Sequence, residues 1–205
     1  MKPKDIGTDS DRALLLDFQA TLEIKPEKAI KLEKDALAQI ENITADNARL
    51  VSNLHANLGG LYRMNGHPDL AREHMEKSIS LLDQFNLLHI NDSIPQIANY
   101  AMFLTEQQEP ERGISELQKL SGIIKEYHSD ECLDYAKVQE TLATIYLMTA
   151  NLSHAKTHFK KAFKIYEKIW ADEPEMIEAK YLEIQELYPQ IGFSIGKTLS
   201  GLLTK

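Results

Sequence analysis

The sequence repeats itself at a spacing of 42 residues. Four segments align without gaps at this spacing: KPEKA at 25–29, HPDLA at 67–71, EPERG at 109–113 and NLSHA at 151–155. Proline stands second in the first three segments, and a small residue stands last in all four. A fixed period of about 20–50 residues is typical of arrays in which each unit buries its apolar face against the next unit. The repeat therefore limits the fold to a stacked array.

Each unit is predicted to contain two helices joined by a tight turn. Before the turn, a large residue, a small residue and an aromatic or apolar residue recur, as in Leu58, Gly59 and Tyr62. After the turn, proline suits the first position of a helix because no useful N–H donor is lost there, and the acidic residue that follows suits the positive end of the helix dipole. The second helices are therefore predicted to start near Pro26, Pro68, Pro110 and Leu152.

These columns resemble the tetratricopeptide repeat. The segments NLGGLY…A…M..S and TLATIY…A…F..A show the resemblance, which extends over residues 10–170. The basic period of the family is about 34 residues, and the longer spacing resembles the subtype of kinesin light chains and bacterial peptide-sensing regulators. The resemblance implies an all-α fold, an α-α superhelix of antiparallel hairpins. Asp17 and Glu33 replace a small and an aromatic residue in the first copy, and we interpret them as the solvated side of a terminal repeat.

The predicted organisation has three parts. They are an N-terminal extension at 1–9, four repeats at about 10–51, 52–93, 94–135 and 136–172, and C-terminal capping helices at 173–205. One capping helix is expected to begin near Pro174 and to break at Pro189. The last helix has one apolar stripe, formed by Ile191, Ile195, Leu199 and Leu202. We interpret it as a cap, and the alternative is a partner-binding or homodimerisation helix.

Composition and charge narrow the class of partner. The formal net charge of -8 argues against a surface that neutralises phosphates, so no nucleic-acid partner is expected. The single cysteine, Cys132, cannot form an internal disulfide. No secretory signal and no long apolar run is present, so we expect a cytoplasmic protein without membrane attachment.

Motifs for chemistry are weak. The segment GFSIGKTLSG at 192–201 has three residues between Gly192 and Gly196, one fewer than a phosphate-binding loop needs, which leaves nucleotide binding through Gly196, Lys197 and Thr198 as a remote alternative. His154 and His158 share a helix face without a third ligand nearby, and we interpret the histidines as solvated. The expectation is a non-enzyme without metal or cofactor.

The resemblance places function in a concave groove lined by the first helices. In the related 42-residue subtype, an asparagine before the large buried residue often contacts the backbone of a bound peptide. That column contains Leu15, Asn57, Asn99 and Thr141 here. The alternative is that the two asparagines solvate the groove or hydrogen-bond to a neighbouring repeat. The candidate groove residues are Asn53, Asn57, Arg63, Met64, Asn99, Met102, Lys137, Thr141 and Met148.

The predicted function is the non-catalytic binding of an extended peptide or partner segment. A carboxylate clamp of the chaperone-binding type needs several basic residues in the groove columns, and only Arg63 and Lys137 are available. The amide and methionine side chains fit an extended peptide better. The alternative is a stand-alone peptide-sensing regulator whose array changes curvature when the ligand binds.

Overall fold

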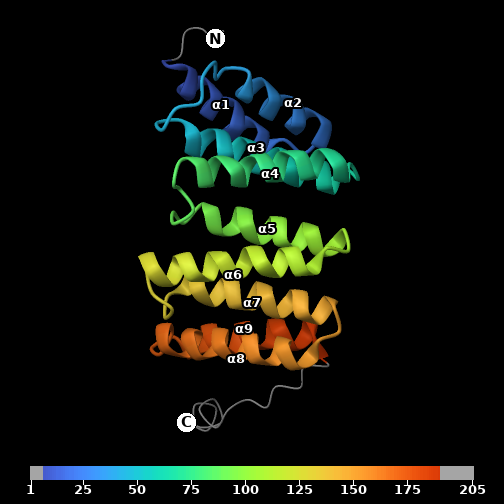
Figure 1. Cartoon of the computed structure of the whole chain (residues 1–205), viewed down its shortest axis with the longest axis vertical. Helices are drawn as coiled ribbons and strands as arrows, with labels where there is room; N and C mark the ends of the chain where they lie inside the picture. The colour runs from blue at the N-terminus through green and yellow to red at the C-terminus, as the bar shows by residue number, and fades with distance from the viewer. Residues whose placement is uncertain (1–6, 190–205) are drawn as a thin grey trace. The chain divides into compact units, whose positions relative to one another are not determined.

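A computed structural model describes residues 7–189, and within that range every regular element is a helix (Figure 1). The helices are α1 (Asp9–Leu22), α2 (Pro26–Leu37), α3 (Ala48–Met64), α4 (Pro68–Gln84), α5 (Ser93–Glu106), α6 (Pro110–Tyr127), α7 (Leu133–Met148), α8 (Leu152–Ile169) and α9 (Pro174–Leu187). The all-α prediction is confirmed, and so are the predicted starts of the four second helices and of α9. The apolar stripe and the glycine motif after Pro189 lie outside the described residues.

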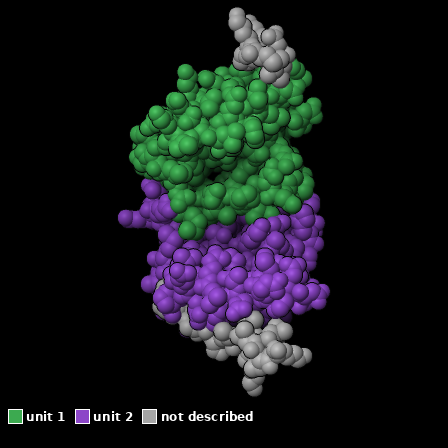
Figure 2. Space-filling view, turned by 180° about the vertical axis from the view of Figure 1, so that it is seen from behind, with its two compact units in different colours: residues 1–103 green, residues 104–205 purple. Residues whose placement is uncertain are grey.

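The chain forms two compact units that divide inside α5 (Figure 2). In the first unit, Met1–Phe103, α1 packs on α2, α3 packs on α4, and α2 contacts α3. In the second unit, Leu104–Lys205, α7 packs on both α6 and α8, and α9 contacts α8. Within its unit, each of the runs α1–α4 and α6–α9 is therefore a stack in which successive helices contact one another.

The turn between the two helices of a hairpin has the same backbone in three repeats. Gly66, Gln108 and Ala150 occupy the same repeat column and have φ angles of 72°, 65° and 58°. This left-handed residue lets the next amide reach back to a carbonyl five residues earlier, which satisfies a free carbonyl at the helix end. These bonds join His67 to Tyr62 at 2.9 Å, Glu109 to Leu104 at 2.8 Å and Asn151 to Tyr146 at 2.7 Å. The segment Gly-His-Pro-Asp at 66–69 is thus the turn between α3 and α4.

The small residues of the first helices allow close packing. A Cβ atom added at Gly59 would lie 2.6 Å from Cγ of Met75 on α4, so α3 and α4 approach too closely there for a larger residue. The same two columns of the second unit contain Ala143 and Phe159, both fully buried. Small-against-large packing therefore explains why these columns recur.

A histidine pair crosses the α3–α4 hairpin. The Nδ1 atoms of His55 and His74 lie 2.9 Å apart, and the His74 ring stacks on Tyr62 with 5.4 Å between ring centroids. Burial lowers the pKa of both histidines, that of His55 to about 4. The expectation of solvated histidines is therefore only partly met by this pair, because both rings are half-buried, His74 against Tyr62 and His55 against His74.

The α7–α8 hairpin repeats this arrangement two periods later. Nδ1 of His158 donates a hydrogen bond to Oε1 of Gln139 at 2.8 Å, and the His158 ring stacks on Tyr146 at 5.3 Å. His154 stacks on the same tyrosine at 4.9 Å. Burial lowers the pKa of His158 to about 4. The two histidines on this face therefore pack on an aromatic ring, and His158 is only partly solvated.

Candidate functional site

A pocket of about 210 Å³ opens in the first unit. Its lining comes from α3, α4 and α5: Ala56, Gly60, Arg63, Met64, Met75, Ser78, Gln96 and Asn99. Pockets for drug-sized ligands and cofactors usually measure about 300–1,000 Å³, so this one has room for a small group such as a side chain. The combination of methionine and amide side chains suits a segment of polypeptide.

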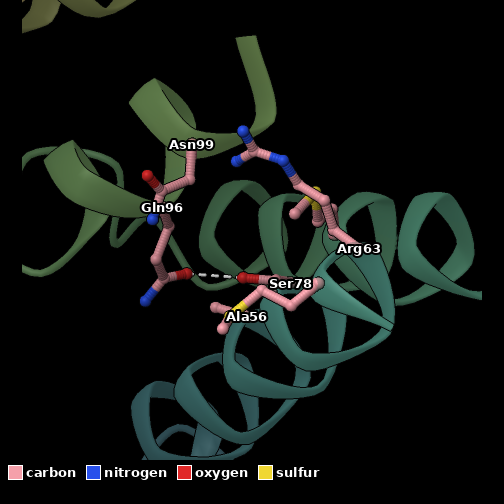
Figure 3. Close-up of a pocket in the computed structure, with 8 residues that line it drawn as sticks. Ala56, Arg63, Ser78, Gln96 and Asn99 are labelled. Atoms are coloured by element: carbon pink, nitrogen blue, oxygen red, sulfur yellow. Dashed lines mark hydrogen bonds between the residues drawn. The ribbon is translucent and has the colours of Figure 1, made fainter. Parts of the chain in front are cut away.

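Three of the predicted groove residues meet at this pocket. Arg63 and Asn99 project into the space between α3 and α5, as Figure 3 shows, and Met64 lines the same pocket. The Met64 side chain is 81% exposed, which places a large apolar group in water. Asn99 is also exposed, and no other described residue hydrogen-bonds to its amide. Apolar surface and an available amide therefore lie together.

The pocket wall is held by a buried hydrogen-bond network around Gln96. The hydroxyl groups of Ser52 and Ser78 both donate to Oε1 of Gln96, that of Ser52 at 2.8 Å (Figure 3 draws the bond from Ser78). Nε2 of Gln96 donates to Oδ1 of Asn53 at 2.6 Å. The two serines and Gln96 are each at most 9% exposed. Such a network joins α3, α4 and α5 in one arrangement, because an unpaired member would be costly.

Asn53 links this network to the surface. Its Nδ2 atom donates to Oδ2 of Asp92 at 3.3 Å, and Arg49 binds the same oxygen at 2.6 Å. The hydrogen bond from Arg49 is the main cause that lowers the pKa of Asp92. Both ends of the Asn53 amide are therefore used inside the protein, and Asn53 supports the pocket wall.

Asn57 faces the first hairpin. Its Nδ2 atom donates to Oδ1 of Asp17 at 2.9 Å and to Oε1 of Glu33 at 3.1 Å. The two asparagines that share a column thus differ, since the Asn99 amide has no such partner among the described residues. The Glu33 side chain is only 1% exposed, so its interpretation as part of a solvated side is wrong. Helix α3 covers it.

The remaining predicted residues lie elsewhere. Met102 is half-buried on α5. Lys137, Thr141 and Met148 lie on α7 in the second unit. Lys137 pairs with Asp134 at 3.9 Å, and the Thr141 hydroxyl donates to the Lys137 carbonyl at 3.0 Å.

The candidate groove residues left out five lining residues: Ala56, Gly60, Met75, Ser78 and Gln96. A signal was present for Gln96, whose repeat column contains Leu54 and Val138 in other copies. Both are fully buried, so a glutamine in that column predicts a polar group inside a core position. Such a group needs partners, and the serines of neighbouring helices provide them.

No group of three metal-ligating side chains occurs within residues 7–189. Cys132 caps α7, where its Sγ atom accepts from the amide of Tyr135 at 3.5 Å. In the described part of the chain, no helix has the length and apolar character needed to cross a membrane.

A family model described as tetratricopeptide repeat matches residues 93–168. Residues 93–168 of this chain contain tetratricopeptide repeats. Repeats of this family generally mediate protein–protein interactions and are typically non-catalytic scaffolds, and this general role is the one that the fold supports. The comparison with curated proteins found no match.

Solved structures share the fold. One match is a single-residue variant of nearly identical TPR-like repeats from Podosopora anserina, described as kinesin light chain. It has a TM-score of 0.69 and 14% identity, and the match covers 82% of this chain and 81% of that chain. The form without that substitution matches at 0.66 and 15%, covering 81% of each chain. BtubC (BKLC) from P. vanneervenii matches at 0.65 and 19%, covering 77% of this chain and 62% of that chain. This chain thus spans less than two thirds of BtubC, and at these identities the likeness concerns the tetratricopeptide fold alone.

Proposed function

We propose that this chain is a non-catalytic binding module that holds an extended segment of a partner protein against the α3–α5 face of its first unit. The observation that carries the proposal is the pairing of an exposed Met64 with an Asn99 amide that no residue of 7–189 hydrogen-bonds, at one pocket. A methionine side chain adapts its shape to an apolar side chain of the segment. An amide can donate to a backbone carbonyl and accept from a backbone N–H at the same time.

The second unit offers related side chains. Met148 is 49% exposed, and Lys137 is exposed on the same helix, in the repeat columns of Met64 and Asn53. We include this face of α7 as a separate contact surface of the second unit. A role of the C-terminal segment in dimerisation concerns residues outside the described part of the chain.

Selection from a random-peptide library on the immobilised protein tests the proposal. Enriched peptides are expected to bind the wild type and to lose at least about tenfold in affinity with Met64→Ala plus Asn99→Ala, because central anchors dominate such interfaces. Met176→Ala is the matched control, since Met176 is 43% exposed on α9, outside the pocket. Failure to enrich any peptide, or full affinity in the double variant, would contradict the proposal.

Alanine substitutions at Asn57 and Asn99 are expected to affect stability differently. In Asn57→Ala, loss of the two bonds to carboxyl groups is expected to lower the free energy of unfolding by about 1–2 kcal/mol. Asn99→Ala is expected to change it by less than about 0.5 kcal/mol, because the amide is exposed and has no hydrogen bond to the described part of the chain. Urea denaturation of the two variants measures the difference.

A further inference from the structure

The first hairpin has two carboxyl groups where the second hairpin has an apolar contact. Asp17 on α1 occupies the repeat column of Gly59, and Glu33 on α2 occupies that of Met75. The Gly59–Met75 contact is tight enough to exclude a Cβ atom. A pair of acidic side chains therefore replaces one of the closest apolar contacts of the repeat.

Glu33 is buried with an unsatisfied oxygen. Its side chain is 1% exposed, and its Oε2 atom has no hydrogen-bond partner among the described residues. Burial is the main cause that raises the pKa of Glu33 to about 8, and the charge of Asp17 adds to the rise. Glu33 is therefore mostly protonated at neutral pH. An unpaired buried polar atom destabilises the folded state, so this position favours the arrival of a hydrogen-bonding partner.

Asn57 shows which kind of group the carboxyls attract. Its Nδ2 atom lies 2.9 Å from Oδ1 of Asp17 and 3.1 Å from Oε1 of Glu33, so a nitrogen with two N–H groups already bridges them. This nitrogen is neutral, so its hydrogen bonds to Asp17 and Glu33 add no positive charge to the pair. A cationic N–H group binds carboxylates about twice as strongly as a neutral one.

We propose that Asp17, Glu33 and Asn57 form a binding site for the cationic end of a lysine or arginine side chain of the partner segment. This inference rests on the proposed function, because it assigns the chemistry of one residue in that segment. Asp17 is half-buried and Asn57 is exposed, so the cluster reaches the surface beside α1 and α3. The net charge of -8 attracts a cationic segment over a longer range.

On binding, the cationic group of the partner segment replaces the Asn57 amide as the donor to the two carboxyl groups. The incoming cation hydrogen-bonds to Asp17 and Glu33, Glu33 releases its proton to solvent, and two carboxylates then face one positive charge. The Asn57 amide leaves the carboxyl oxygens and becomes available to the backbone of the partner segment. Asn57 then has two states. Without the partner it hydrogen-bonds to Asp17 and Glu33, and with the partner bound it faces the groove.

Small cations test the site directly. In protein with ¹³C-labelled glutamate and aspartate side chains, n-butylammonium and n-butylguanidinium are expected to lower the pKa of Glu33 saturably, whereas n-butanol leaves it unchanged. The drop caused by the cations should be lost in Asp17→Asn, a variant that keeps the shape of the pair. No cation-specific drop, an equal drop in Asp17→Asn, or a drop with Mg²⁺ alone would overturn the site.

Peptide selection tests whether this site binds a cationic residue of the partner segment. The variant Asp17→Gly with Glu33→Met installs the pair of the second hairpin, and circular dichroism checks its fold. Peptides selected on the wild type are expected to share one lysine or arginine position, and those selected on the variant should keep the rest of the motif and lose that position. Peptides that bind without a shared cationic position would overturn this inference and leave the proposed function intact. An empty selection would remove both.

Discussion

His158 and Gln139 are hydrogen-bonded across the α7–α8 hairpin, with 2.8 Å between Nδ1 and Oε1. Two periods earlier, His74 makes the corresponding bond to His55 at 2.9 Å across α3–α4. Gln139 and His55 therefore hold their hairpins in the same way with different chemistry, because only the histidine can take up a proton. This difference predicts how the two hairpins respond to acid.

His55→Gln should make the first unit more resistant to acid. Burial, the charge of His74 and that of Lys77 lower the pKa of His55 to about 4 from 6.5. The unfolded chain takes up this proton first, so its contribution to stability is present above pH 6.5 and is lost as the pH falls toward 4. Glutamine preserves the bond to His74 without titrating. We expect unchanged stability at about pH 7.5 and a gain of about 1–2 kcal/mol at about pH 5.

Urea denaturation at both pH values measures this effect. His128→Gln is the control, since His128 is an exposed histidine in the other unit. An equal gain in both variants would assign the effect to net charge, and a loss at neutral pH would show that glutamine does not replace His55.

Glu33→Gln should have the opposite pH dependence. The native state holds a proton on Glu33 up to about pH 8, whereas the unfolded chain releases it near pH 4.5. Stability from this group is therefore lost as the pH rises from about 4.5 to 8. Glutamine offers a similar donor at every pH. We expect equal stability near about pH 5 and a gain of about 2 kcal/mol near about pH 9.

Thermal denaturation across this range measures the effect, with the exposed Glu126→Gln as control. Parallel pH profiles of wild type and Glu33→Gln would contradict the raised pKa.

Two adjacent glycines of α3 should respond in opposite directions to alanine. A Cβ atom at Gly59 meets Cγ of Met75 at 2.6 Å and the carbonyl oxygen of Ala71 at 3.3 Å, whereas one at Gly60 meets nothing within 4 Å. Gly59→Ala is expected to cost about 1–3 kcal/mol through overpacking. Gly60→Ala is expected to add about 0.5–1 kcal/mol through helix propensity. Chemical denaturation measures the free energy of unfolding of both variants. Equal changes in the two variants would show that α4 moves away from Gly59 without cost.

The left-handed turn predicts a stabilising glycine. Ala150 has a φ of 58°, where a Cβ atom costs about 1–2 kcal/mol. Ala150→Gly should therefore stabilise the protein by about 0.5–1 kcal/mol after the added entropy of the unfolded chain is subtracted. Gly66→Ala, in the same column, should destabilise it by about 1 kcal/mol. A rise in melting temperature for the first variant and a fall for the second are expected, and the reverse order would contradict the argument.

The sequence by itself determined the secondary structure and its period. Pro26, Pro68 and Pro110 mark helix starts because the restraint on proline φ and its missing donor act locally. The small residue at Gly59 and the large residue at Met75 could also be predicted from the sequence. Helical spacing and the repeat period place these two columns on facing helices.

Only the tertiary structure decided the partners of the polar side chains. Asn57 and Asn99 share a column, yet Asn57 bonds to Asp17 and Glu33 while the Asn99 amide meets no described partner. Column position determines the helix face of a side chain, but a hydrogen bond depends on atoms of other helices within about 3 Å. The repeat column of Glu33 is buried in other copies, as Met75 and Phe159 show, but only the packing of α3 brings the Asn57 amide to the Glu33 carboxyl group. The repeat therefore predicts where side chains stand, and the packing of neighbouring hairpins decides what they bind.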